Sequence, residues 1–239
     1  MRIMTSPHVV AVIPAAGVGS RMQADRPKQY LSLAGKTILE HTVTLLLNHP
    51  SVSRVVIAIS HDDDFIHSLP IIANANIDLV EGGKTRADSV LNALATLPEE
   101  SWALVHDAAR PCVSHQDIDA LLAVMNNSNT TGGILASPVR DTMKRACDHG
   151  QASLISHTES RENLWHALTP QLFPTGVLLR ALNKALSNSV TITDEASAIE
   201  YAGGKVALIN GNPANIKITH PADLPLAEFY IKQTHKVTE

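Results

Sequence analysis

The chain has 239 residues, of which 44% are hydrophobic and 18% charged, and its formal net charge at pH 7 is −4. This size fits one large α/β domain, or one domain plus a small appendage. The negative charge argues against broad nucleic-acid binding, and an aromatic content of 3% argues against a base-stacking platform. Any basic patch should therefore be local and directed at a small anion.

The cysteine content and the lengths of the apolar runs bear on location. Cys112 and Cys147 are too few and too far apart for a disulfide framework, and CxxC spacing is absent. A reducing cytoplasm is therefore the expected location. The apolar stretches fall short of the ~20 residues that a membrane-spanning helix needs, so we expect no membrane partner.

Continuous apolar, β-branched runs alternate with helical patterns along the chain. The runs occupy residues 9–13, 54–59, 77–80, 102–105, 133–136 and 205–209. Such runs are typical of a mostly parallel sheet that is covered on both faces. Capping-box signals at Thr37, Thr85 and Ser114 predict three helix starts, and residues 221–232 predict a last amphipathic helix. The pattern predicts one three-layer α/β domain over residues 1–239.

Residues 139–163 interrupt this alternation because they are polar. Two short alternating runs at 142–147 and 153–157 flank a turn predicted at Asp148-His149-Gly150. Two strands alone are only marginally stable in water. The segment is therefore either a loose surface hairpin or an arm that docks on a second subunit, where symmetry lets both arms exchange. We favour the arm, which predicts a homodimer.

The N-terminal strand runs into a loop of small residues followed by cations. Small residues let an anion approach the backbone, where successive N–H groups can cradle it. Arg21 and Lys28 add positive charge suited to a polyphosphate. The alternative is an ordinary strand-to-helix turn with two surface cations. The loop residues that we expect at the anion are Ala15, Ala16, Gly17 and Gly19.

Three common nucleotide-binding and hydrolase patterns are incomplete in this chain. Gly17-x-Gly19 begins a dinucleotide fingerprint, but Met22 stands where the third glycine is needed for helix packing. Gly35-Lys36-Thr37 ends like a P-loop, but Tyr30 replaces its first glycine. A GxSxG elbow is absent. The sequence therefore does not support a dehydrogenase, a P-loop kinase or a serine hydrolase.

Seven motifs follow one another in a specific order. They are Pro14-Ala15-Ala16-Gly17-Val18-Gly19-Ser20-Arg21-Met22 with Pro27-Lys28-Gln29-Tyr30, Gly82-Gly83-x-x-Arg86-x-x-Ser89-Val90, His106-Asp107-Ala108-Ala109-Arg110-Pro111, Asp141-Thr142, Thr169-Pro170-Gln171, Thr193-Asp194-Glu195 and Asn215-Ile216-Lys217. In this combination the chain resembles the 2-C-methyl-D-erythritol 4-phosphate cytidylyltransferases of the non-mevalonate isoprenoid pathway. The resemblance spans essentially the whole chain. It implies a Rossmann-like nucleotidyltransferase domain with a mostly parallel sheet and a protruding β-arm.

The resemblance also implies roles for individual residues. Arg21, Lys28 and Lys217 correspond to catalytic cations, and Asp107 lies near a Mg²⁺ ion that the CTP phosphates mainly hold. The positions that correspond to the CTP site are Ala15, Ala16, Gly17, Gly19, Arg21, Lys28, Gly82, Gly83, Ser89 and Asp107. Those that correspond to the methylerythritol phosphate site, some of them supplied by the partner subunit's arm, are Asp107, Arg110, Thr142, Arg161, Thr169, Thr193 and Lys217.

The implied reaction joins CTP to 2-C-methyl-D-erythritol 4-phosphate and releases pyrophosphate. The product, 4-diphosphocytidyl-2-C-methyl-D-erythritol, is an isoprenoid precursor. Because a phosphate monoester is already anionic, the reaction needs cations more than a strong general base. Two alternatives share most of the nucleotide motifs. One is a ribitol 5-phosphate cytidylyltransferase, and the other is a non-catalytic nucleotide-binding protein that keeps the fold.

Overall fold

The computed structural model describes residues 8–17, 22, 25–149 and 152–236. A seven-stranded sheet forms its centre, with strands in the order β11-β7-β10-β6-β1-β4-β5. The bounds of these strands are β1 (Val9–Pro14), β4 (Val52–Ile59), β5 (Ile77–Glu81), β6 (Trp102–Val105), β7 (Gly132–Pro138), β10 (Trp165–Pro174) and β11 (Val206–Asn210). All neighbours pair in parallel except β10, which is antiparallel to both β6 and β7. The mostly parallel sheet predicted from the sequence is confirmed.

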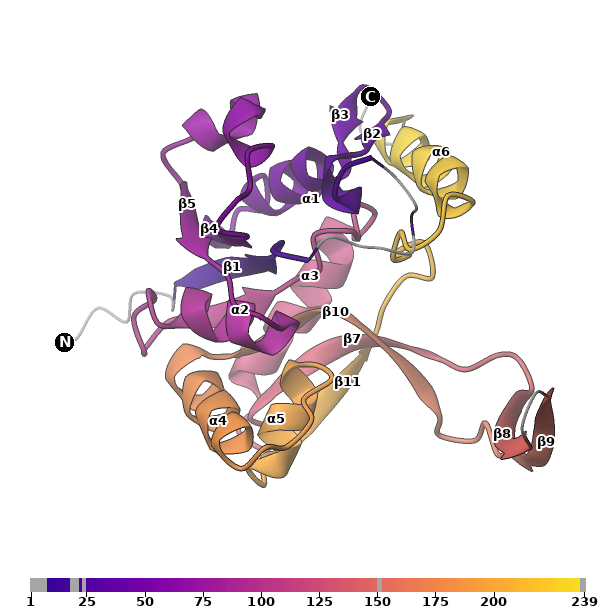
Figure 1. Ribbon diagram of the computed structural model, residues 1–239. Helices are drawn as coiled ribbons and strands as arrows, with labels where there is room; N and C mark the ends of the chain where they lie inside the picture. Colours follow the sequence, from indigo (N-terminus) through magenta and orange to yellow (C-terminus); the bar gives the residue numbers. More distant parts are fainter. Residues whose placement is uncertain (1–7, 18–21, 23–24, 150–151, 237–239) are drawn as a thin grey trace.

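Helices cover both faces of this sheet (Figure 1). One face packs against α1 (Ile38–Leu47) and α3 (His115–Leu122). The other packs against α2 (Arg86–Leu94), α4 (Thr175–Ser187) and α5 (Glu195–Tyr201). The last helix, α6 (Asp223–Lys236), lies beside the short strands β2 (Ser32–Leu33) and β3 (Lys36–Thr37). The three-layer architecture is therefore confirmed. Within the described ranges, no helix combines the length and apolar character needed to cross a membrane.

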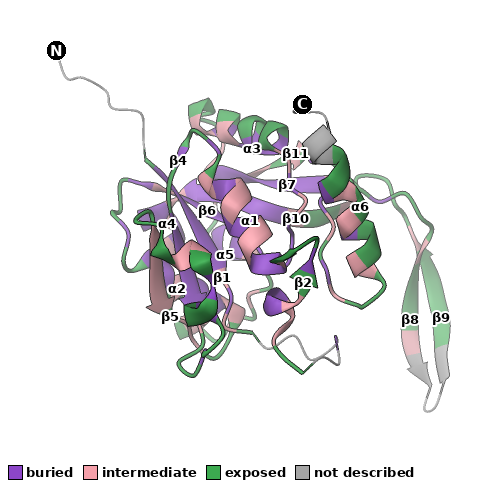
Figure 2. Cartoon of the chain, turned by 90° about the horizontal axis from the view of Figure 1, so that it is seen from above, coloured by how far each residue is buried: buried purple, intermediate pink, exposed green. Residues whose placement is uncertain are grey.

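The continuous apolar character of β1 follows from its position between two helical layers. Successive side chains of a strand point to opposite faces of the sheet. Val9, Ala11 and Ile13 belong to the hydrophobic cluster that includes α1 and α3. Val10 and Val12 belong to the cluster that includes α2, α4 and α5. Every position of the strand from Val9 to Ile13 is thus buried, and Figure 2 shows the buried sheet interior.

The three capping boxes expected from the sequence are present. The side chains of Thr37, Thr85 and Ser114 each accept from the backbone N–H three residues on, and the acidic residue at that position reaches back to the cap. Each box satisfies backbone donors that a helix start leaves unpaired. These caps fix where α1, α2 and α3 begin, and α2 begins at the candidate site.

Among the elements that the sequence analysis did not single out are the strand β10 and the helices α4 and α5. The strand β10 carries buried Thr169 and Gln171 among its apolar residues and ends at Pro174, so it lacks a continuous apolar run. The predicted turn at 148–150 differs from the structure at its first two residues, and Gly150 lies outside the described residues. Asp148 and His149 are still paired with Ser153 and Ala152 as part of a strand.

The polar segment 139–163 forms a hairpin that projects from the body. Its strands β8 (Met143–His149) and β9 (Ala152–Glu159) pair with each other and lie at the far end of the ribbon that β7 and β10 begin (Figure 1). These two strands pack against each other and make few contacts with any other element. Leu154 and Ile155 of this arm are 52% and 66% exposed. A protruding arm is therefore observed.

Candidate active site

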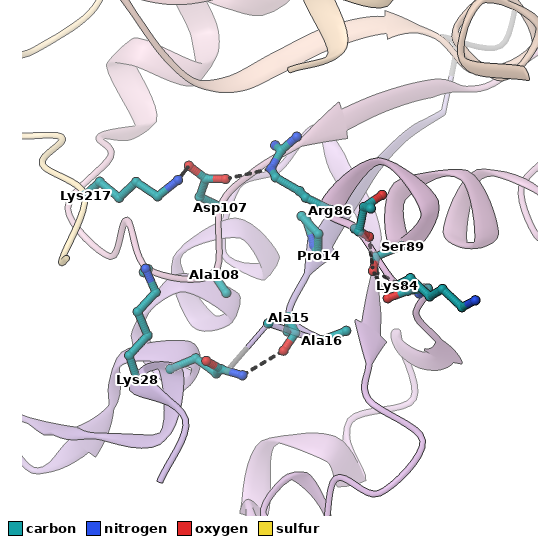
Figure 3. A pocket seen from close by; sticks show the side chains of 15 residues that line it. Pro14, Ala15, Ala16, Lys28, Lys84, Arg86, Ser89, Asp107, Ala108 and Lys217 are labelled. Carbon is teal, nitrogen blue, oxygen red and sulfur yellow. Dashed lines mark hydrogen bonds and ion pairs between the residues drawn. The ribbon is translucent and has the colours of Figure 1, made fainter. Parts of the chain in front are cut away.

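A pocket of about 250 Å³ opens beside the carboxyl end of β1 (Figure 3). In open α/β sheets, ligands bind in the crevice outside the carboxyl ends of the strands. Loops from distant parts of the chain line this pocket: the loop after β1, the turn before β2, the start of α2, the turn after β6 and the segment before α6. The lining residues are Pro14, Ala15, Ala16, Gly17, Lys28, Gln29, Gly83, Lys84, Thr85, Arg86, Ser89, Asp107, Ala108, Ala109 and Lys217.

Close packing between the loop after β1 and the start of α2 explains the glycine pair. A Cβ atom at Gly82 would lie 2.7 Å from Ala16 Cβ and 2.9 Å from Ser89 Oγ. The N–H of Gly83 donates to Ser89 Oγ at 3.0 Å, and that hydroxyl donates to the carbonyl of Thr85 at 3.0 Å. Glycine at position 82 therefore lets the α2 end of the pocket close against the β1 loop.

Lys28 lies on a short 3₁₀ turn, Lys28–Tyr30, that two buried side chains hold in place. Gln29 Nε2 donates to the carbonyl of Ala15 at 2.7 Å, and Tyr30 Oη donates to Asp63 Oδ2 at 2.6 Å. Lys28 Nζ itself donates to the carbonyl of Ile218 at 3.1 Å. Burial, followed by the hydrogen bond to Asp63, raises the pKa of Tyr30 above its ordinary value, so its hydroxyl remains a donor. The turn thus fixes Lys28 to the loop after β1.

Asp107 accepts from three cations at the carboxyl end of β6. Its Oδ1 lies 3.2 Å from Arg86 Nε, and its Oδ2 lies 2.9 Å from Lys217 Nζ and 3.3 Å from Arg110 Nε. Burial by itself would raise the pKa of this carboxyl group. The three positive charges outweigh burial and hold its pKa well below the usual range. Asp107 is therefore a permanent carboxylate, and it orients all three cations, of which Figure 3 shows Arg86 and Lys217.

Arg86 joins this cluster to a second buried carboxylate. Its Nη1 and Nη2 donate to Glu195 Oε1 and Oε2 at 2.6 and 3.1 Å. Glu195 is only 1% exposed. Burial disfavours a charged guanidinium, but Glu195 and then Asp107 outweigh it and raise the pKa of Arg86. The group therefore stays positive.

A second cavity of about 240 Å³ adjoins the first. Its walls come from β10, the segment before α5 and the same charged cluster. The lining residues are Arg86, Asp107, Arg110, Ala167, Leu168, Thr169, Gln171, Thr193, Asp194 and Lys217. Arg86, Asp107 and Lys217 line both cavities. A group bound in one cavity would therefore meet a group bound in the other across two cations and one carboxylate.

Comparison with known proteins agrees with this geometry. Residues 9–233 match the family model described as 2-C-methyl-D-erythritol 4-phosphate cytidylyltransferase. The chain belongs to this family. It is 64% identical over 230 residues to the enzyme of that name from Alteromonas mediterranea, covering 96% of this chain and 95% of the relative. It is 58% identical over 236 residues to the one from Vibrio vulnificus, covering 97% of both.

The fold agrees with crystal structures of the cytidylyltransferase family. The structure of the Francisella tularensis 2-C-methyl-D-erythritol 4-phosphate cytidylyltransferase superposes with a TM-score of 0.81. The two chains are 36% identical, and the match covers 93% of this chain and 99% of the other. The likeness therefore extends over nearly the whole of both chains.

The structure brings together most of the site residues that the cytidylyltransferase resemblance implied. Those at the first pocket are Ala15, Ala16, Gly17, Lys28, Gly83, Ser89, Asp107 and Lys217. Those at the second cavity are Asp107, Arg110, Thr169, Thr193 and Lys217. Gly82 packs directly behind Ala16. Gly19 and Arg21 lie outside the described residues.

Two implied residues of the cytidylyltransferase site lie away from both cavities. Thr142 and Arg161 are exposed where the arm leaves the body, and the arm projects away from the central sheet and its helices (Figures 1 and 2). Arg161 donates through Nη1 to the carbonyl of Arg140. Within one chain these two residues do not complete the site.

Residue-by-residue reasoning passed over Arg86, Gln29 and Glu195 as site residues. Each stands inside a quoted motif, so the signal was present. The place of each residue in the site depends on a hydrogen bond to a distant part of the chain. Arg86 binds Glu195, 109 positions away, and Gln29 binds Ala15, 14 positions away. Sequence order alone does not show such contacts.

Proposed function

We propose that the protein catalyses the reaction of 2-C-methyl-D-erythritol 4-phosphate with CTP to give 4-diphosphocytidyl-2-C-methyl-D-erythritol and pyrophosphate. The product is an isoprenoid precursor. The observation that carries this proposal is the pair of adjoining cavities that share Arg86, Asp107 and Lys217. One cavity suits a nucleotide triphosphate and the other a small phosphorylated polyol. Family membership supports the same pair of substrates.

The nucleotide belongs in the first pocket. Small residues and the cations Lys28 and Lys217 line it, and these suit a triphosphate that approaches the backbone closely. Ser89 and the glycine pair lie at the other end, where they would meet the cytosine. Gly19 and Arg21 extend the same loop in sequence, and we assign them to the triphosphate as well.

The polyol phosphate belongs in the second cavity. Arg110 supplies a cation for the phosphate, and hydroxyl and carboxylate groups suit the polyol. We propose that Thr142 and Arg161 reach this cavity from the partner subunit of a homodimer. The exposure of Leu154 and Ile155 on a projecting two-stranded arm supports such docking.

In the reaction, a phosphate oxygen of the polyol phosphate attacks the α-phosphorus of CTP. The new P–O bond forms in line with the bond to the β-phosphate, which breaks as pyrophosphate leaves. The attacking group is already anionic, so no strong general base is required. Lys28, Lys217 and Arg21 offset the repulsion between the two anions and stabilise charge on the equatorial and leaving oxygens.

The residues present fit a Mg²⁺ ion that the nucleotide mainly holds. Among the described residues, no three His, Cys, Asp or Glu side chains form a cluster for a metal. Asp107 is a permanent carboxylate that lines both cavities. Mg²⁺ commonly binds one or two carboxylates together with substrate phosphates. We assign Asp107 as the protein ligand. The ion would neutralise phosphate charge.

The remaining assignments concern location and partners. We propose a cytoplasmic protein that binds neither nucleic acid nor membranes, and that residues 1–239 form one domain. The net charge of −4 and the free thiols of Cys112 and Cys147 support this reading.

The decisive experiment measures pyrophosphate release from CTP and Mg²⁺ with a panel of polyol phosphates. We expect turnover with 2-C-methyl-D-erythritol 4-phosphate, and much slower turnover with ribitol 5-phosphate. Preference for ribitol 5-phosphate would reassign the substrate. Tight CTP binding with no pyrophosphate release from any acceptor would make the protein a nucleotide-binding protein without this activity.

A further inference from the structure

The turn after β6 carries two charged side chains of the site, Asp107 and Arg110. Asp107 lines both cavities and Arg110 the second. The N–H of Arg110 donates to the carbonyl of Asp107 at 3.1 Å, which closes the turn. Directly before it, the N–H of His106 donates to the carbonyl of Val12 at 2.9 Å and ties the turn to β1. The contacts that fix the two ends of this turn therefore decide where the side chains of Asp107 and Arg110 point.

His106 has a fully buried imidazole, 0% exposed, that contacts one end of this turn. Its Nε2 lies 2.9 Å from the carbonyl oxygen of Arg110. A carbonyl oxygen only accepts, so Nε2 carries the proton. Its Nδ1 lies 3.0 Å from Thr169 Oγ1. In the neutral ring, which burial favours, Nδ1 is an acceptor and the hydroxyl of Thr169 donates to it.

Thr169 contacts the other end of the turn. Its Oγ1 accepts the N–H of Asp107 at 3.0 Å. The polar path therefore runs from the Asp107 N–H through the Thr169 hydroxyl to His106 Nδ1, and from His106 Nε2–H to the Arg110 carbonyl. Both ends of the turn are bound to one pair of buried side chains. No step in this path uses a side-chain atom of Asp107 or Arg110, so the path holds the backbone of the turn and leaves the ion pairs of the two side chains undisturbed.

The same threonine fixes the segment that carries Lys217. The carbonyl of Thr169 accepts from Asn215 Nδ2 at 2.8 Å, and the carbonyl of Asn215 accepts from Arg110 Nη1 at 2.8 Å. Asn215 is 1% exposed and stands two residues before Lys217. Thr169 thus links β10 to the two segments that present Asp107, Arg110 and Lys217.

We propose that His106 and Thr169 are positioning residues that hold the 107–110 turn in its reactive geometry. The inference rests on the proposed cytidylyltransferase activity. It gives the Thr169 hydroxyl an internal role, because both His106 and Asp107 already engage that group. A charged group misplaced by about 1 Å can lower a rate by roughly 10²-fold. Loss of the hydroxyl should therefore reduce turnover in a protein that still folds.

The test compares Thr169→Val with Thr169→Ser and Thr175→Val. Valine keeps the shape of threonine without the hydroxyl, and serine keeps the hydroxyl. Thr175 is a matched control because it is 0% exposed, bonds Ser101 Oγ through its own hydroxyl at 2.8 Å and lines neither cavity. Thr175→Val removes one buried hydrogen bond and Thr169→Val removes two, so both melting temperatures should fall, with the larger fall in Thr169→Val.

The kinetic outcome separates positioning from stability. For Thr169→Val we expect kcat/KM for the polyol phosphate to fall at least ~10-fold, for Thr169→Ser to recover most of that loss, and for Thr175→Val to stay within ~3-fold. The Kd for CTP should change less, because Arg110 lines only the second cavity. Equal kinetics for the two valine variants would overturn the inference.

A second measurement keeps the inference testable if Thr169→Val does not fold or wild-type turnover is absent. Absence of wild-type turnover would count against the proposed function. In either case, nitrogen NMR of the wild-type protein at pH 7 reads the His106 ring directly. We expect the Nε2–H tautomer with Nδ1 as a hydrogen-bond acceptor. A ring protonated on Nδ1 would overturn the inference.

Discussion

Arg86 and Glu195 stand 109 positions apart, yet two hydrogen bonds of 2.6 and 3.1 Å join their side chains. Each is the first residue of its helix, α2 and α5 respectively. Glu195 gains from its position at a helix N-terminus, whereas Arg86 at such a position needs compensation. The carboxylate of Glu195 supplies the compensating negative charge and holds the Arg86 side chain toward Asp107. The starts of two helices thus meet at the wall shared by the two cavities.

This pair should be energetically coupled. Replacing Glu195 with Gln leaves Arg86 undercompensated. We expect the free energy of unfolding to fall by about 1–3 kcal/mol. This is less than the ~3–5 kcal/mol lost when a fully buried pair is broken, because the Arg86 side chain is 30% exposed. Urea unfolding of Glu195→Gln, Arg86→Gln and the double variant measures the coupling. Additivity within ~0.5 kcal/mol would show that the two groups act independently.

Lys28 should matter for turnover and not for folding. Its ammonium group lies at the first pocket and donates to the Ile218 carbonyl. Removing one preorganised donor to negative charge that develops in the transition state costs about 10²–10³-fold in kcat. We therefore expect Lys28→Ala to lower kcat by about that factor with little change in melting temperature. The control is Lys205→Ala, an exposed lysine outside both cavities. Near-native turnover of Lys28→Ala would contradict its assignment.

The hydroxyl of Tyr30 should hold in place the 3₁₀ turn that carries Lys28. The hydrogen bond from its hydroxyl to Asp63 is buried, and Asp63 also accepts the N–H groups of Phe65 and Ile66. Tyr30→Phe leaves one carboxylate oxygen without this donor, which should cost about 1–2 kcal/mol of stability. Because the turn also carries Lys28, kcat should fall several-fold. Thermal unfolding and steady-state kinetics together check this expectation. Unchanged stability of Tyr30→Phe would show that this hydrogen bond does not hold the turn in place.

His49 should make stability depend on pH. Its side chain is 0% exposed, and burial lowers its pKa although Asp119 opposes the shift and nearby His115 adds to it. Its Nδ1 accepts the N–H of Ser51. A depressed folded pKa means that the unfolded state binds more protons below pH ~6.5, so stability is full above that pH and falls as the pH drops through the folded pKa.

Urea unfolding between pH 7.5 and pH 5 measures this effect in the wild-type protein and in His49→Gln. Glutamine does not titrate, so the variant should lose a resolvable part of the pH slope. Equal slopes would mean that His49 titrates alike in the folded and unfolded states.

The proposed sharing of arms predicts complementation between two inactive variants. If each site combines Lys28 of one subunit with Arg161 of the partner subunit, both Lys28→Ala and Arg161→Ala homodimers should be nearly inactive. Co-expression yields heterodimers with one intact site. Random pairing makes half of the dimers mixed, so we expect about one quarter of wild-type activity. Co-expressed variants no more active than their parents would refute the shared site.

The strands and helix starts that could be predicted are those whose signal lies within a short stretch of the sequence. β1 is buried on both faces, so all of its residues are apolar and the run is visible in sequence. The capping residues Thr37, Thr85 and Ser114 bond within four residues of themselves. The order of the motifs likewise required no knowledge of the sheet to indicate a nucleotide site and a family.

The elements that were missed owe their form to distant contacts. β10 carries Thr169 and Gln171, which bond Asp107, His106 and the start of α5, so its sequence lacks the apolar regularity of a buried strand. The role of Glu195 depends on Arg86 in the same way. By itself the sequence determined the fold class and the family, and it predicted the anion loop. The tertiary structure decided which charges meet, because the sheet order brings β6, β10 and the starts of α2 and α5 to one wall.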